Sequence, residues 1–268
     1  MSADRLGAGR AIDRASAVTE MRWPELASLT PARVALGRSG TSLPTRQWLD
    51  FGLAHARARD AIHQPLHRAQ LQRELEIDGW TCLEVGSRAP DRQAYLARPD
   101  WGRRLHADSR GRLVAARQVG CDLVVVVSDG LSSAAIHAHA GLLLRALRPL
   151  LADLRWAPLV IATQARVALA DEVGEVLGAR MALSMIGERP GLSSPDSLGI
   201  YLTATPRVGR HDAERDCISN IHAAGLGYAE AAEQAARLVR AGLQRGRSGV
   251  AQVGVDACSG PLPAPPAT

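Results

Sequence analysis

The segment Gly187-Glu188-Arg189-Pro190-Gly191 contains residue types that are well suited to hold a ligand. Glycine lets the backbone approach a large planar ligand closely, and proline fixes the backbone between its neighbours. The carboxylate of Glu188 can accept hydrogen bonds from amide or hydroxyl groups. The alternative is an exposed Glu188–Arg189 pair, which would contribute little to stability. The segment therefore predicts a binding loop with Glu188 as its candidate ligand-contacting side chain.

A second unusual segment is Cys217-Ile218-Ser219-Asn220-Ile221-His222. Its small side chains offer hydrogen-bond donors and acceptors at the approach to a helix. Cys217 and His222 could in principle form a nucleophilic pair. They are five residues apart, however, and the sequence offers no evident orienting partner for His222. We therefore favour a polar loop with one buried cysteine over a catalytic thiol.

The absence of lysine excludes several kinds of chemistry, because all 32 basic residues are arginine. Without a side-chain amine the chain cannot form a Schiff base with pyridoxal phosphate. It also cannot form a Walker A motif, whose lysine binds phosphate. An anionic ligand would have to be held by arginine, by helix N-termini or by backbone N–H groups.

Other motifs are incomplete or absent. There is no GxSxG nucleophile elbow, and the glycines at 225 and 227 lack the third glycine of a dinucleotide fingerprint. His137 and His139 are two apart on a predicted helix, so they point to different faces and make a poor metal pair. The four cysteines, at 82, 121, 217 and 258, form no CxxC and fit no zinc spacing. The sequence therefore predicts neither a catalytic side chain nor a metal ligand.

The elements that would position these segments follow from apolar patterns. Cys121–Val127 (CDLVVVV) is unbroken and apolar, which is typical of a strand buried on both faces of a parallel sheet. Further strands are predicted over 80–85, 158–163, 180–186 and 199–204. Helices are predicted over 45–62, after Pro65, after Asp91, from Ser132 or Ser133 to about 147, over 171–177, and over 228–243. Alternation of strands with helices predicts an α/β fold with a Rossmann-like, doubly wound, mainly parallel sheet.

In such a sheet ligands bind beyond the carboxyl ends of the strands, near a topological switch point. Three loops follow the predicted buried strands: Ser128–Gly130, Gln164–Val167 and Gly187–Gly191. Each loop alone could be an ordinary turn before a capped helix. Because they share one edge of the predicted sheet, we expect the ligand there.

The chain organisation follows from composition. Residues 1–40 are weakly periodic and rich in small residues, which predicts a flexible N-terminal arm with at most one short helix. A helical region is predicted over 41–78, in which two amphipathic helices pack together, and a Rossmann-like domain over 79–257. The Pro- and Ala-rich stretch predicts a disordered tail over 258–268.

The formal net charge of +5 does not predict nucleic-acid binding, because the arginines are interspersed with acids and form no basic block. There is no run of about 18 apolar residues, so we expect no membrane span. The N-terminus lacks the apolar region of a secretory signal. The cysteine pattern suggests a reduced, cytoplasmic protein.

Several stretches, in collinear order across roughly residues 33–255, resemble one family, the small subunit of ethanolamine ammonia-lyase. GERPGL together with CISNI is highly specific to it. The stretches are LPTRQWLDFGLAHARARDAIH at 43–63, SRAPDRQAYLARPDWGRRL at 87–105, VVVSDGLSS at 125–133, GERPGLSSPDSLGIYL at 187–202 and DCISNIHAAGLGYAEAA at 216–232.

The resemblance implies an adenosylcobalamin-dependent lyase that converts ethanolamine to acetaldehyde and ammonia by a radical rearrangement. The domain over 79–257 would then bind cobalamin, with cofactor contacts from Val167, Glu188 and Cys217. Cobalamin-binding mutase domains commonly carry an Asp-x-His-x-x-Gly motif, whose histidine ligates cobalt. That motif is missing here, in agreement with a family that keeps its own dimethylbenzimidazole on the metal.

The resemblance also implies a partner, a large TIM-barrel subunit that holds the substrate and with which this chain would form a hetero-oligomer. Two other hypotheses stay open from the sequence. A stand-alone nucleotide enzyme is disfavoured by the incomplete GxGxxG and the missing lysine. A targeting role is the other, because the N-terminal arm of some relatives directs the enzyme into a bacterial microcompartment.

Overall fold

The computed structural model of the chain describes residues 18–19, 24–117 and 120–252. The chain divides into two compact units, Met1–Ala56 and Arg57–Thr268. The predicted tail over 258–268 and the first seventeen residues of the predicted arm lie outside the described residues. The predicted boundaries at residues 40, 78 and 257 differ from this division and stay predictions.

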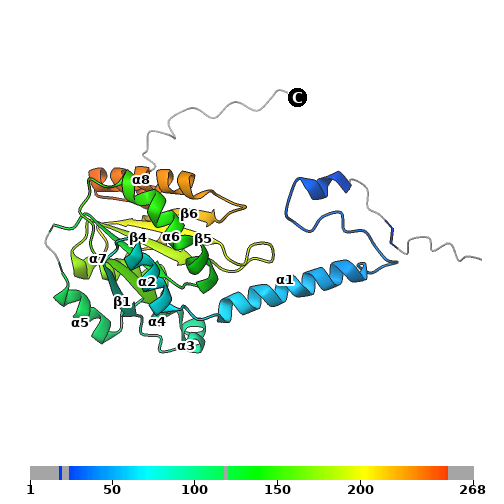
Figure 1. Ribbon diagram of the computed structural model, residues 1–268, viewed down its shortest axis with the longest axis horizontal. Helices are drawn as coiled ribbons and strands as arrows, with labels where there is room; N and C mark the ends of the chain where they lie inside the picture. Colours follow the sequence, from blue (N-terminus) through cyan, green and yellow to red (C-terminus); the bar gives the residue numbers. More distant parts are fainter. Residues whose placement is uncertain (1–17, 20–23, 118–119, 253–268) are drawn as a thin grey trace, which may run out of the picture. The chain divides into compact units, whose positions relative to one another are not determined.

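The second unit is built on a six-stranded sheet in the order β1-β3-β2-β4-β5-β6 (Figure 1). Pairs β1–β3, β3–β2 and β2–β4 are parallel, whereas β4–β5 and β5–β6 are antiparallel. The strands are β1 (Cys82–Gly86), β2 (Leu123–Ser128), β3 (Leu159–Thr163), β4 (Met181–Gly187), β5 (Leu198–Ala204) and β6 (Asp216–Ile221). The sheet is therefore mixed.

The α-helices connect and cover these strands. They are α1 (Thr45–His63), α2 (Arg68–Ile77), α3 (Arg92–Ala97), α4 (Pro99–Gly102), α5 (Ala107–Ala115), α6 (Ser133–Leu150), α7 (Leu169–Leu177) and α8 (Tyr228–Arg245). Short 3-10 helices span η1 (Pro24–Ser28), η2 (Asp212–Glu214) and η3 (Gly249–Gln252).

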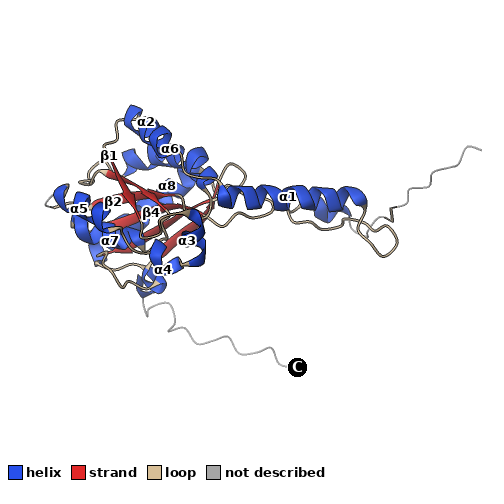
Figure 2. Cartoon of the chain, turned by 90° about the horizontal axis from the view of Figure 1, so that it is seen from below, coloured by secondary structure: helices blue, strands red, loops and turns tan. Residues whose placement is uncertain are grey.

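Helices lie on both faces of the sheet (Figure 2). The connection from β2 through α6 to β3 crosses the sheet in one direction, and that from β3 through α7 to β4 crosses in the other. Right-handed crossovers therefore place α6 and α7 on opposite faces. The apolar residues of α2, α6 and α8 form one core cluster, and those of α5 and α7 form a second.

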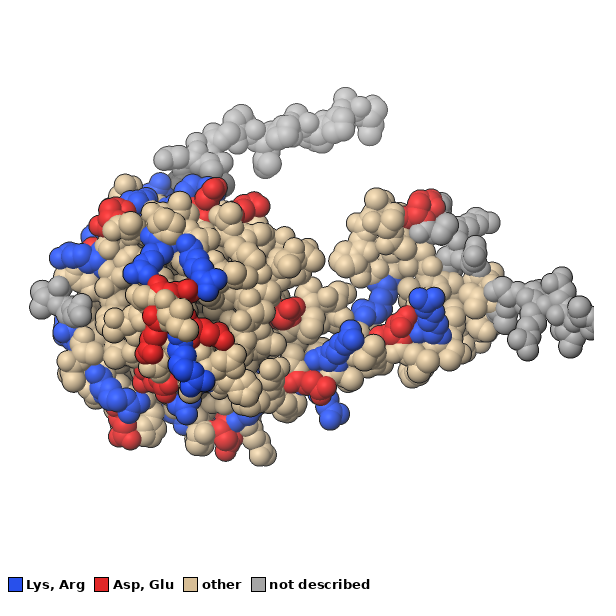
Figure 3. Space-filling model, in the orientation of Figure 1, with Lys and Arg blue, Asp and Glu red and all other residues tan. Residues whose placement is uncertain are grey.

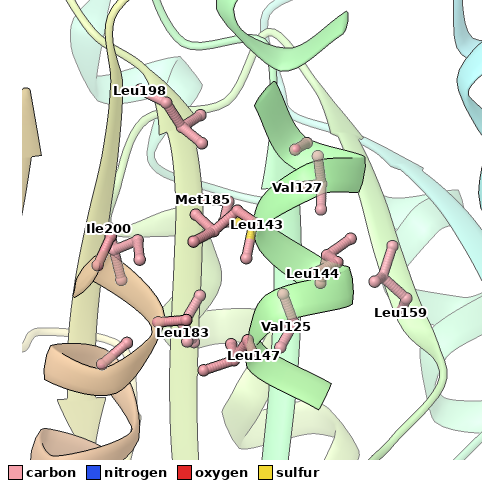
Figure 4. Packing of buried hydrophobic residues seen from close by; sticks show 14 of the residues in the cluster. Val125, Val127, Leu143, Leu144, Leu147, Leu159, Leu183, Met185, Leu198 and Ile200 are labelled. Atoms are coloured by element: carbon pink, nitrogen blue, oxygen red, sulfur yellow. The ribbon is translucent and has the colours of Figure 1, made fainter. Parts of the chain in front are cut away.

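The core beneath α6 is built from aliphatic side chains (Figure 4). Leu143, Leu144 and Leu147 of α6 are fully buried, and they face apolar residues of four strands. These facing residues are Val125, Val127, Leu159, Leu183, Met185, Leu198 and Ile200. A core with so few aromatic residues depends on close packing of small side chains.

Local signals for the predicted helices are confirmed. Asp91 caps α3 by accepting a hydrogen bond from the Ala94 N–H (2.8 Å), and Ser132 caps α6 through the Ala135 N–H (3.3 Å). Gly178 ends α7 with φ +72°. The predicted end of α6 near residue 147 is too early, because the helix continues through Pro149 to Leu150.

One sequence prediction about the sheet holds in part, and another is wrong. The sheet is parallel from β1 to β4, as expected, but loops without crossover helices join β4 to β5 and β5 to β6, and these strands pair antiparallel, so the sheet is mixed. The segment Cys217–His222 is not a loop approaching a helix: Cys217–Ile221 belongs to the edge strand β6. Helices α4 and α5 were also not predicted.

In the first unit, α1 begins at Thr45 as predicted, and an isolated antiparallel bridge joins Thr19 to Arg38. The predicted apolar positions of this helix are exposed: 63% for Trp48, 63% for Leu49 and 51% for Leu53. None of the helices within the described residues is long and apolar enough to span a membrane.

Candidate functional site

The three loops expected to hold the ligand lie side by side at the carboxyl ends of β2, β3 and β4. The carboxylate of Asp129, after β2, accepts hydrogen bonds from the Gln164 N–H (2.9 Å) and the Ala165 N–H (3.1 Å), after β3. On the other side of β2, the Leu131 N–H donates to the carbonyl of Gly187 (2.9 Å), which ends β4. These hydrogen bonds hold the three loops together at one edge of the sheet.

Two glycines of this edge are required by packing between the loops. A Cβ at Gly130, whose φ is +53°, would lie 2.3 Å from the Gly187 carbonyl oxygen. A Cβ at Gly187 would lie 2.0 Å from the Ser132 carbonyl oxygen. The first glycine of GERPG therefore serves loop packing, and we do not assign it to close approach of a ligand.

Glu188 is held where β4, β5 and β6 meet. Its N–H donates to the Ser197 carbonyl (2.9 Å), and its Oε2 accepts a hydrogen bond from the Ser197 hydroxyl (2.5 Å). The Asn220 N–H of β6 approaches the same carboxylate at 3.3 Å. A Cβ at Gly199 of β5 would lie 2.8 Å from Oε1, so the carboxylate lies directly against this glycine.

Cys217 lies on β6 opposite Tyr201 of β5, so the two side chains lie on the same face of the sheet. Partial burial of the thiol raises the pKa of Cys217, and Glu188 acts in the same direction. Burial, followed by Cys217 and Glu188, raises the pKa of Tyr201 to about 12. Both groups are therefore neutral near pH 7, and a protonated thiol is a poor nucleophile.

His222 is not available to activate that thiol. One ring nitrogen, Nε2, is 3.0 Å from the Asn220 side-chain oxygen, and Nδ1 accepts a hydrogen bond from the Ala224 N–H (3.3 Å). These partners assign the ring proton to Nε2. The geometry therefore favours the polar interpretation of Cys217 over a catalytic Cys217–His222 pair, although Cys217 is exposed and not buried as predicted.

Val167 is half-buried in the turn between β3 and α7, at the same edge of the sheet as Glu188. In the strand order, β2 separates β3 from β4, and β5 separates β4 from β6. Strands β3 and β6 are thus four strand spacings apart, roughly 19 Å, with Val167 in the loop after β3 and Cys217 on β6. Three residues spread over this distance suit a large ligand and not a small substrate.

The site extends from the edge of the sheet onto one face. Ser184, Tyr201 and Cys217 are register partners on adjacent strands, so they share a face. Ala182 also points to this face, and it belongs to the core cluster under α7. The chain continues from β5 through β6 to α8, whose buried residues join the opposite cluster. Tyr201 and Cys217 therefore lie on the α7 side of the sheet, beyond the strands that α7 covers.

A buried ion pair anchors this part of the sheet to α7. The Arg215 guanidinium, just before β6, donates to both carboxylate oxygens of Asp171 (2.6 and 2.7 Å) and to the Thr203 hydroxyl (3.0 Å). The side chains of Arg215 and Asp171 are each 2% exposed. Burial raises the pKa of Asp171, and Arg215 opposes that rise. Sequence reasoning missed this pair, because its members are 44 residues apart.

Charge and metal chemistry add little to the site. On the face shown in Figure 3, arginine side chains are interspersed with aspartate and glutamate. Among the residues that the structure describes, no three His, Cys, Asp or Glu side chains are grouped so that they could hold a metal ion.

The family model and the individual relatives that match this chain name the same family. The family model for the ethanolamine ammonia-lyase light chain matches residues 20–252. The chain is 54% identical over 230 residues to a Bradyrhizobium diazoefficiens protein, covering 85% of this chain and 88% of the relative. A Ralstonia nicotianae protein is 51% identical over 243 residues (89% and 90%), and a Xanthomonas campestris protein is 52% identical over 233 residues (85% and 86%). Each of the three is named ethanolamine ammonia-lyase small subunit.

Proposed function

The chain belongs to the ethanolamine ammonia-lyase light-chain family, and we propose that it is the cofactor-binding subunit of an enzyme that converts ethanolamine to acetaldehyde and ammonia. The family match over residues 20–252 is the observation that carries this proposal. The proposed cofactor is adenosylcobalamin, and the proposed contacts are Val167, Glu188 and Cys217.

The residues present fit this cofactor. A corrin is large, rich in amide groups and mostly apolar on its faces, so it needs a broad surface with few polar groups at fixed positions. The side chains of Tyr201 and Cys217 on the uncovered sheet face are themselves neutral near pH 7. The glycine at 199 leaves room for the carboxylate of Glu188, which is fixed by Ser197 and can accept amide N–H groups.

Adenosylcobalamin, when bound, supplies the radical chemistry of the rearrangement. The role of this chain is to bind and orient the cofactor and to exclude water from one side of it. Glu188 would hold amide groups at the edge of the sheet, while Val167 and Cys217 would contact apolar parts. We propose no cobalt ligand from this chain, because the sequence lacks the Asp-x-His-x-x-Gly motif.

We propose that the partner is a large TIM-barrel subunit that carries the substrate pocket, in a hetero-oligomer with this chain. The name small subunit, given to the relatives, supports a larger partner. We also classify the fold as Rossmann-like, because strands β1 to β4 are parallel with crossover helices on both faces. Residence in the cytoplasm, or in a microcompartment directed by the N-terminal arm, is a further hypothesis.

Reconstitution tests the proposed function. The purified chain is mixed with the matching large subunit, adenosylcobalamin and ethanolamine, and acetaldehyde is measured. We expect activity only when both chains are present. Activity of this chain alone, or full activity of the large subunit alone, would contradict the proposal.

A further inference from the structure

Gln164 has an unusual backbone conformation at the end of β3. Its φ is +52°, a left-handed value that is uncommon for a residue with a side chain and that clusters at ligand-binding sites. The conformation is held by Asp129, whose carboxylate accepts the N–H groups of Gln164 and Ala165. The fold thus fixes Gln164 in a conformation that glycine would adopt more easily.

The residue that holds Gln164 is itself firmly placed. Asp129 is 2% exposed, and its Oδ2 lies 3.8 Å from an Nη1 atom of Arg92. The same Nη1 donates to the Gly130 carbonyl (2.7 Å). Burying a carboxylate is unfavourable unless it is paired and hydrogen-bonded. Asp129 therefore defines the position of the loop after β3.

Gln164 lines a cavity at the carboxyl ends of β1 and β3. The cavity has a volume of about 490 Å³, and its walls include Gly86, Ser87 and Thr163. Open α/β sheets bind ligands at this end of their strands. Gln164 also lies in the same loop as Val167, three residues before it.

The charged residues of the cavity wall carry both signs, and Arg112 among them donates to the Ser109 hydroxyl (3.1 Å) and the Glu84 carbonyl (3.3 Å). Arg68 lies 3.2 Å from Glu84, and the ring of His106 lies 3.6 Å from Asp108. The carboxylate of Asp129 is engaged by backbone N–H groups. The wall therefore has no excess of one charge, and it suits a neutral polar group better than an ion.

The side chain of Gln164 provides the polar group that such a ligand would need. Its Oε1 is buried, and it has no hydrogen-bond partner among the residues that the structure describes. Buried polar atoms are nearly always hydrogen-bonded, so this unpartnered acceptor can take a donor from outside the chain, either a water molecule or a ligand. A neutral ligand with an N–H donor would meet this need.

We propose that Gln164 is a further cofactor-binding residue, with Oε1 accepting a hydrogen bond from a primary amide side arm of cobalamin that enters this cavity. The inference rests on the proposed function and adds a contact on the β1 side of Val167. Asp129 then acts as a positioning residue, because it holds the backbone from which the amide of Gln164 extends.

The test measures binding of cyanocobalamin, which needs no turnover, to the assembled two-subunit complex by equilibrium dialysis. Gln164→Gly removes the side chain and suits the left-handed backbone, so its Tm should not fall. Its Kd should rise about tenfold, the equivalent of about 1.4 kcal/mol for one hydrogen bond. Gln164→Ala should show the same loss of affinity, whereas Gln164→Glu keeps an acceptor and should bind more tightly than either.

Gln234→Ala is the matched control, because the amide of Gln234 donates to Glu230 one turn away on α8, so its loss should leave the Kd unchanged. Unchanged affinity in Gln164→Gly would overturn the inference, as would failure of that variant to fold. If the wild-type complex itself does not bind cyanocobalamin, the proposed function fails instead.

Discussion

Gly199→Ala should weaken cofactor binding by moving Glu188, without touching the cofactor. Gly199 lies in β5 opposite Ile186 of β4, in a conformation that alanine can also adopt. The added Cβ would lie 2.8 Å from Oε1 and 3.2 Å from Cγ of Glu188. Because real Cβ atoms essentially never approach so closely, the side chain of Glu188 must shift away from Gly199, which disturbs the hydrogen bonds of its carboxylate.

The expected magnitude follows from the bonds that the carboxylate would lose. Glu188 accepts from the Ser197 hydroxyl (2.5 Å) and is approached by the Asn220 N–H (3.3 Å). A hydrogen bond to a charged group contributes about 1.5–3 kcal/mol, while alanine in place of glycine in a strand regains about 0.5–1 kcal/mol. We expect a net loss of about 1–2 kcal/mol of stability, and a rise in the cobalamin Kd of about tenfold to a hundredfold through lost contact with Glu188.

The assay is cyanocobalamin binding to the assembled complex, combined with urea unfolding of the isolated chain. Glu188→Ala should raise the Kd by a similar factor without unfolding the chain. The double variant should bind no more weakly than Glu188→Ala alone, because both changes remove the same contact. Gly141→Ala is the control, since a Cβ there meets no atom within 4 Å. Wild-type affinity in Gly199→Ala, or full additivity in the double variant, would refute the reasoning.

Three further predictions concern one buried ion pair and two titratable side chains. Arg215→Ala leaves the buried Asp171 carboxylate unpaired and should lower the free energy of unfolding by about 3–5 kcal/mol in urea; a loss below about 1 kcal/mol would contradict the role of the pair. Burial, and then His67, hold the pKa of His137 below its ordinary value, so the unfolded chain binds more protons. The stability that neutral His137 contributes is present above pH 6.5 and is lost as the pH falls, so His137→Gln should reduce the stability loss between about pH 8 and pH 5.5; an unchanged loss would refute this. Because its thiol pKa is raised, Cys217 should react with iodoacetamide near pH 7 more slowly in the folded than in the urea-unfolded chain, and mass spectrometry of the modified peptide would reveal the opposite order.

The strands that the sequence predicts well are those whose burial is complete. Residues 123–128 of β2 are buried at every position, and a continuous apolar run is the signature of such a strand. In β6 only Ile218 and Ile221 are buried, two apolar positions separated by two exposed polar residues. This spacing departs from strict alternation because the register shifts between Leu198 and Ile200 of β5. A bulged edge strand therefore looks like a polar loop in the sequence.

The sequence predicts which loops form the candidate site, because these loops follow predicted strands, but it does not predict the side-chain contacts between them. Loops after consecutive buried strands share an edge whatever their sequence, so the positions of Asp129, Gln164 and Glu188 follow from topology. The contact between Glu188 and Gly199 depends on how an antiparallel strand returns beside β4, and no local spacing encodes it. The Asp171–Arg215 pair likewise joins segments that only the folded chain brings together.

The antiparallel end of the sheet changes what kind of ligand the fold can hold. A further crossover helix after β5 on the α7 side would cover Tyr201 and Cys217 and leave only the carboxyl edge for binding. Here β5 and β6 return directly, α8 packs on the opposite face, and Cys217 stays exposed. The binding surface can therefore run from the loops at the edge across the open face of two strands. A surface of this extent is what a flat ligand much wider than a single loop requires, and it would let Val167 and Cys217 contact one ligand, as we propose, although β3 and β6 are four strand spacings apart.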